Sequence, residues 1–297
     1  MKRRLSPGAR AQAGAARWLL APALITFCAF SVVPVLMTLA LGFTRYDVLT
    51  PPRWVGGANY ADIMKDPTFL ASIWHTFYYT LGTVPPTLVL GLLLAVALNA
   101  RLRGMIVFRT LFYTPVVTSV VAASMIWMWL YNPQFGLLNF FLGKLGVGPQ
   151  QWLSSPEQAM PCLMIMTVWK ELGYAMVIYL AGLQGIPASL YEAAEMDGAA
   201  WWPSLRNVTL PMLRPVTLFL LVTSVIGSFQ VFDAIYVMTK GGPVGATTTV
   251  VHQIYENGFR FLRMGRASAM AVVLFLMILI VSLLNLRVFR RDLEEVL

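Results

Sequence analysis

The sequence is organised by long apolar runs that short polar segments separate. A run of about 20 apolar residues is long enough to cross the hydrocarbon core of a bilayer as a helix. Such runs lie at 18–41, 70–98, 108–131, 159–182, 212–233 and 267–287. Because backbone polar groups in lipid must be satisfied within the chain, each run predicts a spanning helix. Pro85 and Pro86 predict a kink in the second span, packed against neighbouring helices. The pattern predicts an all-α membrane protein with six spans.

Composition agrees with this pattern. Only 12% of the 297 residues are charged, whereas about a quarter is usual for soluble domains. A net charge of +9 could indicate a protein that binds nucleic acid. The basic residues lie largely at the ends of apolar runs, however, so we expect no nucleic-acid partner. The run 18–41 is too long for a cleaved signal peptide and is expected to remain as the first span.

The distribution of Lys and Arg predicts the orientation of the spans. With the N-terminus in the cytoplasm, the inner segments carry Lys2, Arg3, Arg4, Arg10, Arg17, Arg101, Arg103, Arg109, Arg206, Arg214, Arg287, Arg290 and Arg291. The outer segments carry fewer basic residues over longer loops, although the cluster from Arg260 to Arg266 opposes the bias. We expect a cytoplasmic tail at 1–17, a transmembrane domain at 18–287 and a second cytoplasmic tail at 288–297, with the loop 183–211 also facing the cytoplasm.

The segment SLYEAAEMDGAAWWPSLRNVTLP at 189–211 predicts two short helices between the fourth and fifth spans. Ser189 and Glu192 have the spacing of a capping box, which would start the first helix. Gly198 is suited to a left-handed helix end, and Pro203 to the first turn of a second helix that ends near 210–211.

Two interpretations of this segment are open on physical grounds. A short helix beside a bilayer can rest on lipid headgroups, but such helices are usually basic, and this one carries Glu192, Glu195 and Asp197. Its other face is formed by the small residues Ala193, Ala194, Ala199 and Ala200. Small residues allow close approach, so docking into a groove of a partner protein is the better fit.

The same segment carries a family resemblance. Glu192-Ala193-Ala194, Asp197-Gly198-Ala199 and Leu210-Pro211 resemble the EAA loop of ATP-binding-cassette (ABC) importer permeases. The segments 54–80, 108–131 and 229–251 are similar to the maltose-type branch of that family, so the resemblance covers nearly the whole chain. It implies a six-helix type I importer permease in the bacterial or archaeal inner membrane.

The resemblance also implies partners. These are a related sister permease in a heterodimer, two ABC ATPase subunits and an extracytoplasmic binding protein, which would dock on 42–68 and 241–243. The residues expected to couple to the ATPase are Glu192, Ala193, Ala194, Asp197, Gly198, Ala199 and Pro211. The chain itself has no G-x-x-x-x-G-K-[ST] phosphate loop, since GGPVGATTT at 241–249 lacks the lysine. We therefore expect ATP and Mg²⁺ to bind the ATPase and expect no cofactor in this chain.

No catalytic or metal site is predicted either. The sequence contains no G-x-S-x-G or H-E-x-x-H motif, and Cys28 and Cys162 are not paired in a zinc spacing. His75 and His252 are isolated and are expected to have structural roles. An intramembrane enzyme would need a nucleophile and a base, and the sequence offers no such pair.

Polar residues inside spans are costly in lipid and are therefore functional candidates. The predicted substrate pathway consists of Thr167, Glu171, Tyr174, Ser224, Ser228, Gln230 and Asp233. The resemblance places Thr167, Tyr174, Ser224 and Ser228 at sugar-contacting positions. The alternative is hydrogen bonding and ion pairing with the sister permease. The aromatic residues Trp127, Trp129 and Tyr131 are expected to form a belt at the membrane interface.

The cargo and the energy source leave alternatives open. A sugar or oligosaccharide is favoured over glycerol-3-phosphate or another polyol, because Lys170 is the one Lys or Arg away from the ends of the spans. An ion-coupled secondary transporter could use Lys170, Glu171 and Asp233 as a relay, but the six spans show no clear inverted repeat and the 183–211 loop would have no task.

Overall fold

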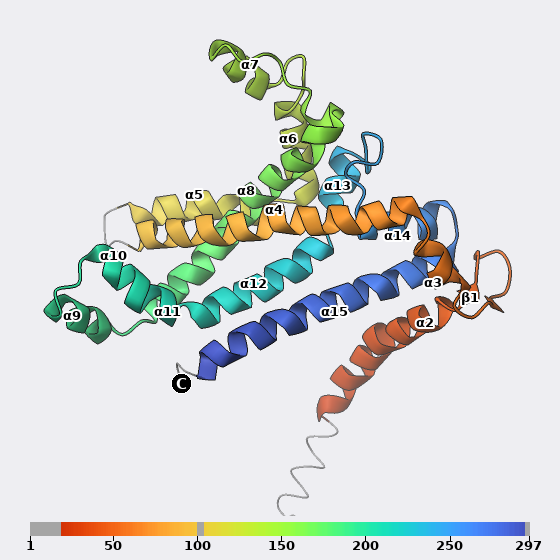
Figure 1. Ribbon diagram of the computed structural model, residues 1–297, viewed down its shortest axis with the longest axis horizontal. Helices are drawn as coiled ribbons and strands as arrows, with labels where there is room; N and C mark the ends of the chain where they lie inside the picture. Colours follow the sequence, from red (N-terminus) through yellow and green to blue (C-terminus); the bar gives the residue numbers. More distant parts are fainter. Residues whose placement is uncertain (1–18, 100–103, 295–297) are drawn as a thin grey trace, which may run out of the picture.

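The computed structural model describes residues 19–99 and 104–294, which are mostly helical (Figure 1). Residues 1–17, Arg101 and Arg103 lie outside the described residues. Five described helices are long and apolar enough to cross a membrane, or six when a bent pair counts as one. The five are Leu19–Leu41, which contains a π turn (Cys28–Val32) and α2 (Val33–Leu41), α4 (Pro67–Leu98), α8 (Pro156–Gln184), α12 (Arg214–Phe229) continued by α13 (Asp233–Met238), and α15 (Met264–Glu294).

Shorter elements connect these helices. They are β1 (Thr44–Arg45), β2 (Arg53–Trp54), α3 (Ala58–Ile63), α5 (Met105–Val117), α6 (Val120–Leu130), α7 (Leu137–Lys144), α9 (Ala188–Met196), α10 (Trp201–Ser204), α11 (Leu210–Met212) and α14 (Val250–Tyr255). A 3₁₀ turn lies at Trp152–Ser154, and π-helical turns lie at Leu205–Thr209 and Glu256–Arg260. The predicted spans thus fall close to the observed helices, although α15 continues beyond 287, where a tail was expected to begin.

The core of the bundle lies where α4, α8 and α12 meet, and α15 packs against α12. Buried apolar side chains from these helices fill it, including Ala95, Met176, Leu220 and Met270. The helix Leu19–Leu41 is different, because its apolar window has no buried residue and α2 diverges from the bundle (Figure 1). Part of α2 packs against α15, and the span presents the rest of its apolar surface to lipid or to another subunit.

The third span is not the single helix that the sequence predicts. α5 and α6 form one apolar run in the sequence, but their axes differ by 100°. The chain is extended at Thr118 and Ser119, and the Thr118 hydroxyl donates to the carbonyl oxygen of Pro115 at 2.6 Å. Hydropathy alone cannot detect such a break, because the residues on both sides of it are equally apolar.

The two prolines of α4 are placed differently from the expectation. α4 continues through Pro85 and Pro86, and Pro85 is exposed while Pro86 is half-buried. Proline has no N–H, so each ring leaves a helical carbonyl unpaired and is best tolerated on a face with room beside it. Pro85 accordingly lies in the wall of an open groove rather than in the core.

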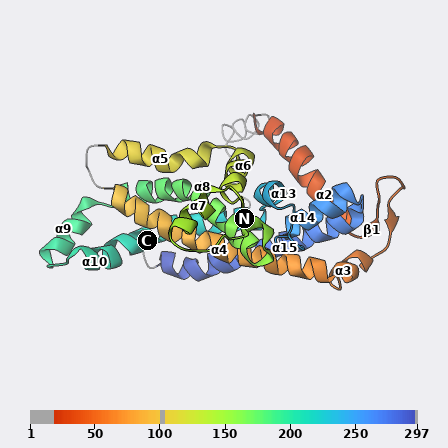
Figure 2. The same cartoon turned by 90° about the horizontal axis from the view of Figure 1, so that it is seen from above.

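The molecule has two distinct ends, and both views show them (Figures 1 and 2). One end carries α9 and α10, and the last described turns of α15 lie on the same side; we call it the α9 end. The opposite end carries β1 and α3; we call it the β1 end. At the β1 end, β1 pairs with β2, Asp66 caps α4 by accepting from the Thr68 N–H at 2.9 Å, and Arg266 forms an ion pair with Asp66.

A close approach of α8 to α5 depends on Gly173. A Cβ at this buried position would overlap the carbonyl oxygen of Phe112 and lie 2.9 Å from the Tyr113 Cα. We expect Gly173→Ala to destabilise the protein by about 1–3 kcal/mol, the usual effect of overpacking. Thermal unfolding of the detergent-purified complex measures the change. Gly143→Ala in α7 is the control, because nothing lies within 4 Å of that position; equal stability of the two variants would contradict the prediction.

Candidate functional site

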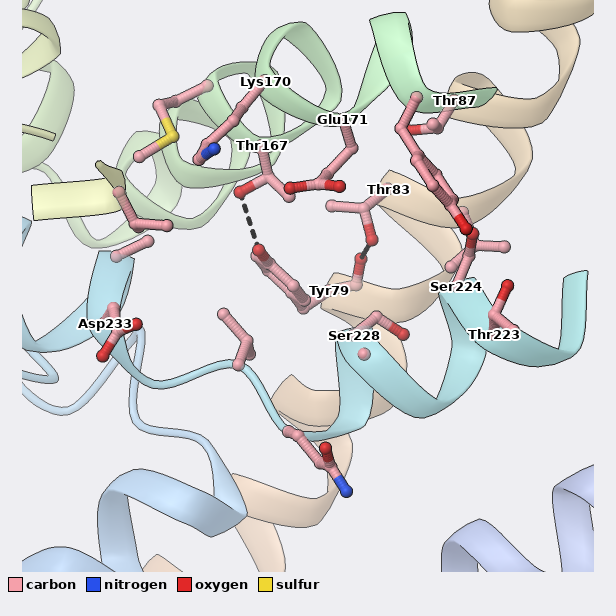
Figure 3. Close-up of a pocket in the computed structure, with 18 of the residues that line it drawn as sticks. Tyr79, Thr83, Thr87, Thr167, Lys170, Glu171, Thr223, Ser224, Ser228 and Asp233 are labelled. Carbon is pink, nitrogen blue, oxygen red and sulfur yellow. Dashed lines mark hydrogen bonds between the residues drawn. The ribbon is translucent and has the colours of Figure 1, made fainter. Parts of the chain in front are cut away.

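A cavity of about 340 Å³ lies among α4, α8, α12 and α13 (Figure 3). Its polar wall is formed by Tyr79, Thr83, Thr87, Thr167, Lys170, Glu171, Tyr174, Thr223, Ser224, Ser228, Gln230 and Asp233. All seven residues of the predicted substrate pathway belong to this wall. The structure thus brings together side chains that lie far apart in the sequence, and their role in transport stays a prediction.

α4 also contributes to the wall, which the sequence did not predict. Tyr79, Thr83 and Thr87 follow one another by four residues and face the cavity. They continue a row of buried hydroxyl residues that begins at Ser72 and Thr76. A spacing of three and four places such residues on one helical face, so this row within an apolar run was the available signal.

Hydrogen bonds fix part of the wall. The Tyr79 hydroxyl and the Thr167 hydroxyl lie 2.7 Å apart, which joins α4 to α8 (Figure 3). The Ser228 hydroxyl donates to the Thr80 hydroxyl at 3.0 Å, which joins α12 to α4. These bonds hold three spans at fixed positions around the cavity.

Lys170 lines the cavity, but its ammonium group is bonded to α5. Its side chain is buried, and the ammonium group donates to the carbonyl oxygens of Pro115 at 3.3 Å and Val116 at 3.2 Å. These carbonyls belong to the last turn of α5, where helical acceptors lack partners and the helix dipole is negative. Lys170 therefore caps the broken third span.

Unlike Lys170, the acidic side chains of the cavity have no bonding partner among the described residues. Glu171 and Asp233 are both exposed and line the wall (Figure 3). Neither forms an ion pair or a side-chain hydrogen bond with another described residue. The cavity is thus lined by two acidic groups, while its one basic group is already bound.

The loop at the α9 end begins differently from the prediction. α9 starts at Ala188 after Pro187, and no side chain caps it. Ser189 and Glu192 both lie inside the helix, so the predicted capping box is wrong. Proline fixes its own φ and limits the residue before it, so Pro187 with φ −58° and ψ 131° sets the start of α9.

The end of α9 is as predicted. Gly198 has φ +74°, and its N–H donates to the Glu195 carbonyl at 2.9 Å. The next N–H, of Ala199, donates to the Ala194 carbonyl at 2.9 Å, which completes a Schellman motif. The second helix begins at Trp201 and ends at Met212, and the Tyr191 hydroxyl lies 3.0 Å from that of Thr209. The two halves of the loop are thereby tied together.

The surface of this loop is uncovered. Glu192, Ala193 and Asp197 are exposed, and Met196 has an exposed fraction of 89%. α9 projects beyond the ends of the long helices (Figure 1). An acidic surface with small residues and an apolar tip is thus available to a partner.

The aromatic residues near the end of α6 do not all form a belt. Tyr131 is 2% exposed and donates to the Cys162 carbonyl at 3.1 Å, so the expected belt position is wrong for this residue. Trp127 packs against Tyr131 and Trp169. Only Trp129, which is exposed, has the accessibility that a belt residue needs.

The two histidines lie near the β1 end. His75 places its Nδ1 3.0 Å from the carbonyl oxygen of Thr248, which links α4 to the loop before α14. His252 is buried, and this burial lowers the pKa of its imidazole even though the Glu256 carboxylate, 4.0 Å away, favours the charged form. The His75 contact fits the structural role predicted for it, whereas both buried ring nitrogens of His252 lack a hydrogen-bond partner among the described residues.

Comparison with known proteins gives a consistent result. Residues 64–291 match the family model described as binding-protein-dependent transport system inner membrane component. The chain is 36% identical to a probable ABC transporter permease protein of Pyrococcus horikoshii over 89% of this chain and 91% of the relative. It is 35% identical to the trehalose/maltose transport system permease protein MalF of Thermococcus litoralis over 92% and 94%. A chain in the crystal structure of a bacterial alginate ABC transporter, bound to a periplasmic protein carrying an alginate pentasaccharide, has a similar fold, with a TM-score of 0.82, 24% identity and coverage of 93% and 96%.

Proposed function

Because this chain belongs to the family of binding-protein-dependent transport system inner membrane components, we propose that its cavity is the pathway for an uncharged sugar or oligosaccharide. The chain is an inner-membrane permease subunit of an ABC importer. The observation that carries the proposal is the gathering of hydroxyl, amide and carboxyl groups from α4, α8, α12 and α13 around one cavity. Such groups can exchange hydrogen bonds with the hydroxyls of a sugar, and aromatic Tyr174 adds a flat apolar surface.

The charge of the wall favours a neutral cargo. A phosphate group would need a free cation, and Lys170 is engaged with the carbonyls of α5. It would also meet Glu171 and Asp233, whose ionised forms repel an anion strongly when water is excluded. Glycerol-3-phosphate is therefore the weaker candidate.

A sister permease would complete this site. Glu171 and Asp233 are exposed on the cavity side, and most of the apolar surface of the helix Leu19–Leu41 is uncovered. A related permease that packs there would form a heterodimer and close the cavity from the second side. The open wall supports this arrangement.

The loop at the α9 end would couple the permease to its motor. We place this end in the cytoplasm, where the acidic and small residues from Glu192 to Ala199 would enter a cleft of an ABC ATPase. The coupling residues would include Pro211, which lies inside α11, and the ATPase would bind ATP and Mg²⁺. A binding protein would dock at the β1 end, on 42–68 and 241–243. ATP and the binding protein would then affect each other's binding reciprocally.

An ion-coupled secondary transporter is less consistent with the cavity. A proton or sodium relay would need Lys170 to exchange with Glu171 or Asp233. Its ammonium group instead donates to the carbonyl oxygens of Pro115 and Val116. It is not within hydrogen-bond distance of either carboxylate.

Replacement of Glu171 tests the cargo proposal. Glu171→Gln keeps the shape of the side chain but removes a charged acceptor, and hydrogen bonds to charged groups contribute about 1.5–3 kcal/mol. We expect uptake of the neutral sugar that copurifies with the binding protein to fall roughly tenfold or more. Glu157→Gln is the matched control, because Glu157 lies on the same helix but outside the cavity. A phosphorylated ligand on the binding protein, or unchanged uptake, would refute the proposal.

A further inference from the structure

A second concavity lies on a different face of α4. This groove has a volume of about 570 Å³ and lies among α4, α8, α11 and α12 toward the α9 end. It shares no lining residue with the sugar cavity. Its walls are apolar and include Pro85, Leu88, Val89, Leu92 and Leu221. The groove is therefore distinct from the sugar cavity.

Two arginines stand at one end of this apolar groove. Arg206 is exposed and Arg214 is half-buried, and both line the groove. Among the described residues, neither guanidinium has an acidic partner within ion-pairing distance or a side-chain hydrogen bond. A guanidinium presents several donors in a fixed plane and binds phosphate oxygens in pairs.

Arg214 lies where α12 begins and has no acidic residue beside it on that helix. Arg214 is the first residue of the 16-residue helix α12, whose first turn contains no acidic residue. Leu213 between α11 and α12 is itself helical, so the two helices are nearly continuous and the charge of Arg214 is what an anion would compensate here. No carboxylate among the described residues pairs with Arg214, and the groove opens beside this arginine.

The apolar walls decide which anion fits. Val89 has an exposed fraction of 57%, and the exposed residues Leu90 and Leu93 continue the apolar surface of α4 past the groove. A free phosphate would gain nothing from such walls, whereas an acyl chain would bury apolar surface against them. Basic pockets between membrane helices are suited to anionic lipid headgroups.

We propose that this groove binds an anionic phospholipid from the leaflet at the α9 end. Arg206 and Arg214 hold the headgroup phosphate, and an acyl chain lies along Pro85, Leu88, Val89 and Leu92. The lipid joins the start of α12 to the middle of α4. It thereby stabilises the part of the bundle that connects the long helices to the α9 loop.

Lipid retention by the whole importer complex tests this proposal. The complex is extracted in mild detergent, and phosphatidylglycerol and phosphatidylcholine are supplied in equal amounts and counted by native mass spectrometry. We expect the double variant Arg206→Gln, Arg214→Gln to retain about tenfold less phosphatidylglycerol than the unmodified complex, with phosphatidylcholine unchanged. The control is Arg45→Gln, Arg53→Gln, which removes two exposed charges from the β1–β2 pair at the other end.

A second measurement does not depend on the arginine variants. A photocrosslinking amino acid at Val89 in the otherwise unmodified complex labels whatever occupies the groove. The proposal expects a phospholipid adduct that anionic lipid increases. A cross-link to the sister permease instead of lipid, or equal retention of phosphatidylglycerol by the double variant, would overturn it.

Discussion

Gly198→Pro is expected to abolish transport and to release the ATPase, while the permease still inserts in the membrane. Gly198 has φ +74°, whereas proline is restricted to a φ near −65°. Proline also removes the N–H that bonds the Glu195 carbonyl. The Schellman motif would be lost, and the chain after α9 would leave in another direction. Because the residue lies outside the long helices, insertion should not change.

The measurement is the amount of ATPase that copurifies with the detergent-extracted complex, together with sugar uptake by the same cells. We expect both to fall roughly a hundredfold, the consequence of losing about 2.7 kcal/mol at the docking surface. Glu192→Lys should act in the same direction without altering the backbone, since Glu192 is exposed and a surface substitution usually changes stability by less than about 0.5 kcal/mol.

Asp62→Lys serves as the control for these variants. It reverses an exposed charge on α3 at the β1 end, far from α9, and is expected to leave ATPase recovery unchanged. Full ATPase recovery with Glu192→Lys and Gly198→Pro would show that α9 is not the coupling element, whatever happens to uptake.

The sequence allowed the cavity residues to be found because lipid penalises polar groups. Thr167, Glu171 and Asp233 stand out within apolar runs, and the structure places all of them on one wall. Gly198 was equally predictable, since few other residues adopt a left-handed helix end without strain. In both cases the signal comes from a residue type that is unfavourable elsewhere.

Other features depend on contacts between distant segments. The bend of 100° between α5 and α6 follows Pro115 and is held by Lys170 of α8, and Tyr131 is buried because its hydroxyl reaches the Cys162 carbonyl. The hydroxyl row of α4 was overlooked for another reason. Threonine is only weakly polar, and its hydroxyl can bond to a carbonyl of its own helix, as Thr83 does with Tyr79.

Lys170→Met is expected to lower the stability of the permease rather than to change its cargo. Methionine matches the length of lysine but removes the donor to Pro115 and Val116. The Pro115 carbonyl keeps the Thr118 hydroxyl as a partner, so Val116 bears most of the loss. A buried acceptor without a partner costs about 1–3 kcal/mol, and the dipole of α5 loses its compensating charge. Thermal unfolding of the purified complex measures the change.

Lys170→Gln separates the capping role from a role in binding cargo. Its amide can still donate to one α5 carbonyl, so we expect a thermal stability between those of the methionine variant and the unmodified protein. Cargo selection should be the same in all three, because the ammonium group is bonded to α5. If Lys170→Met were as stable as the unmodified protein and lost discrimination between neutral and phosphorylated sugars, Lys170 would act on the cargo. The bend would then need another cause, since Lys170 is the side chain that joins the end of α5 to α8 through the carbonyls of Pro115 and Val116.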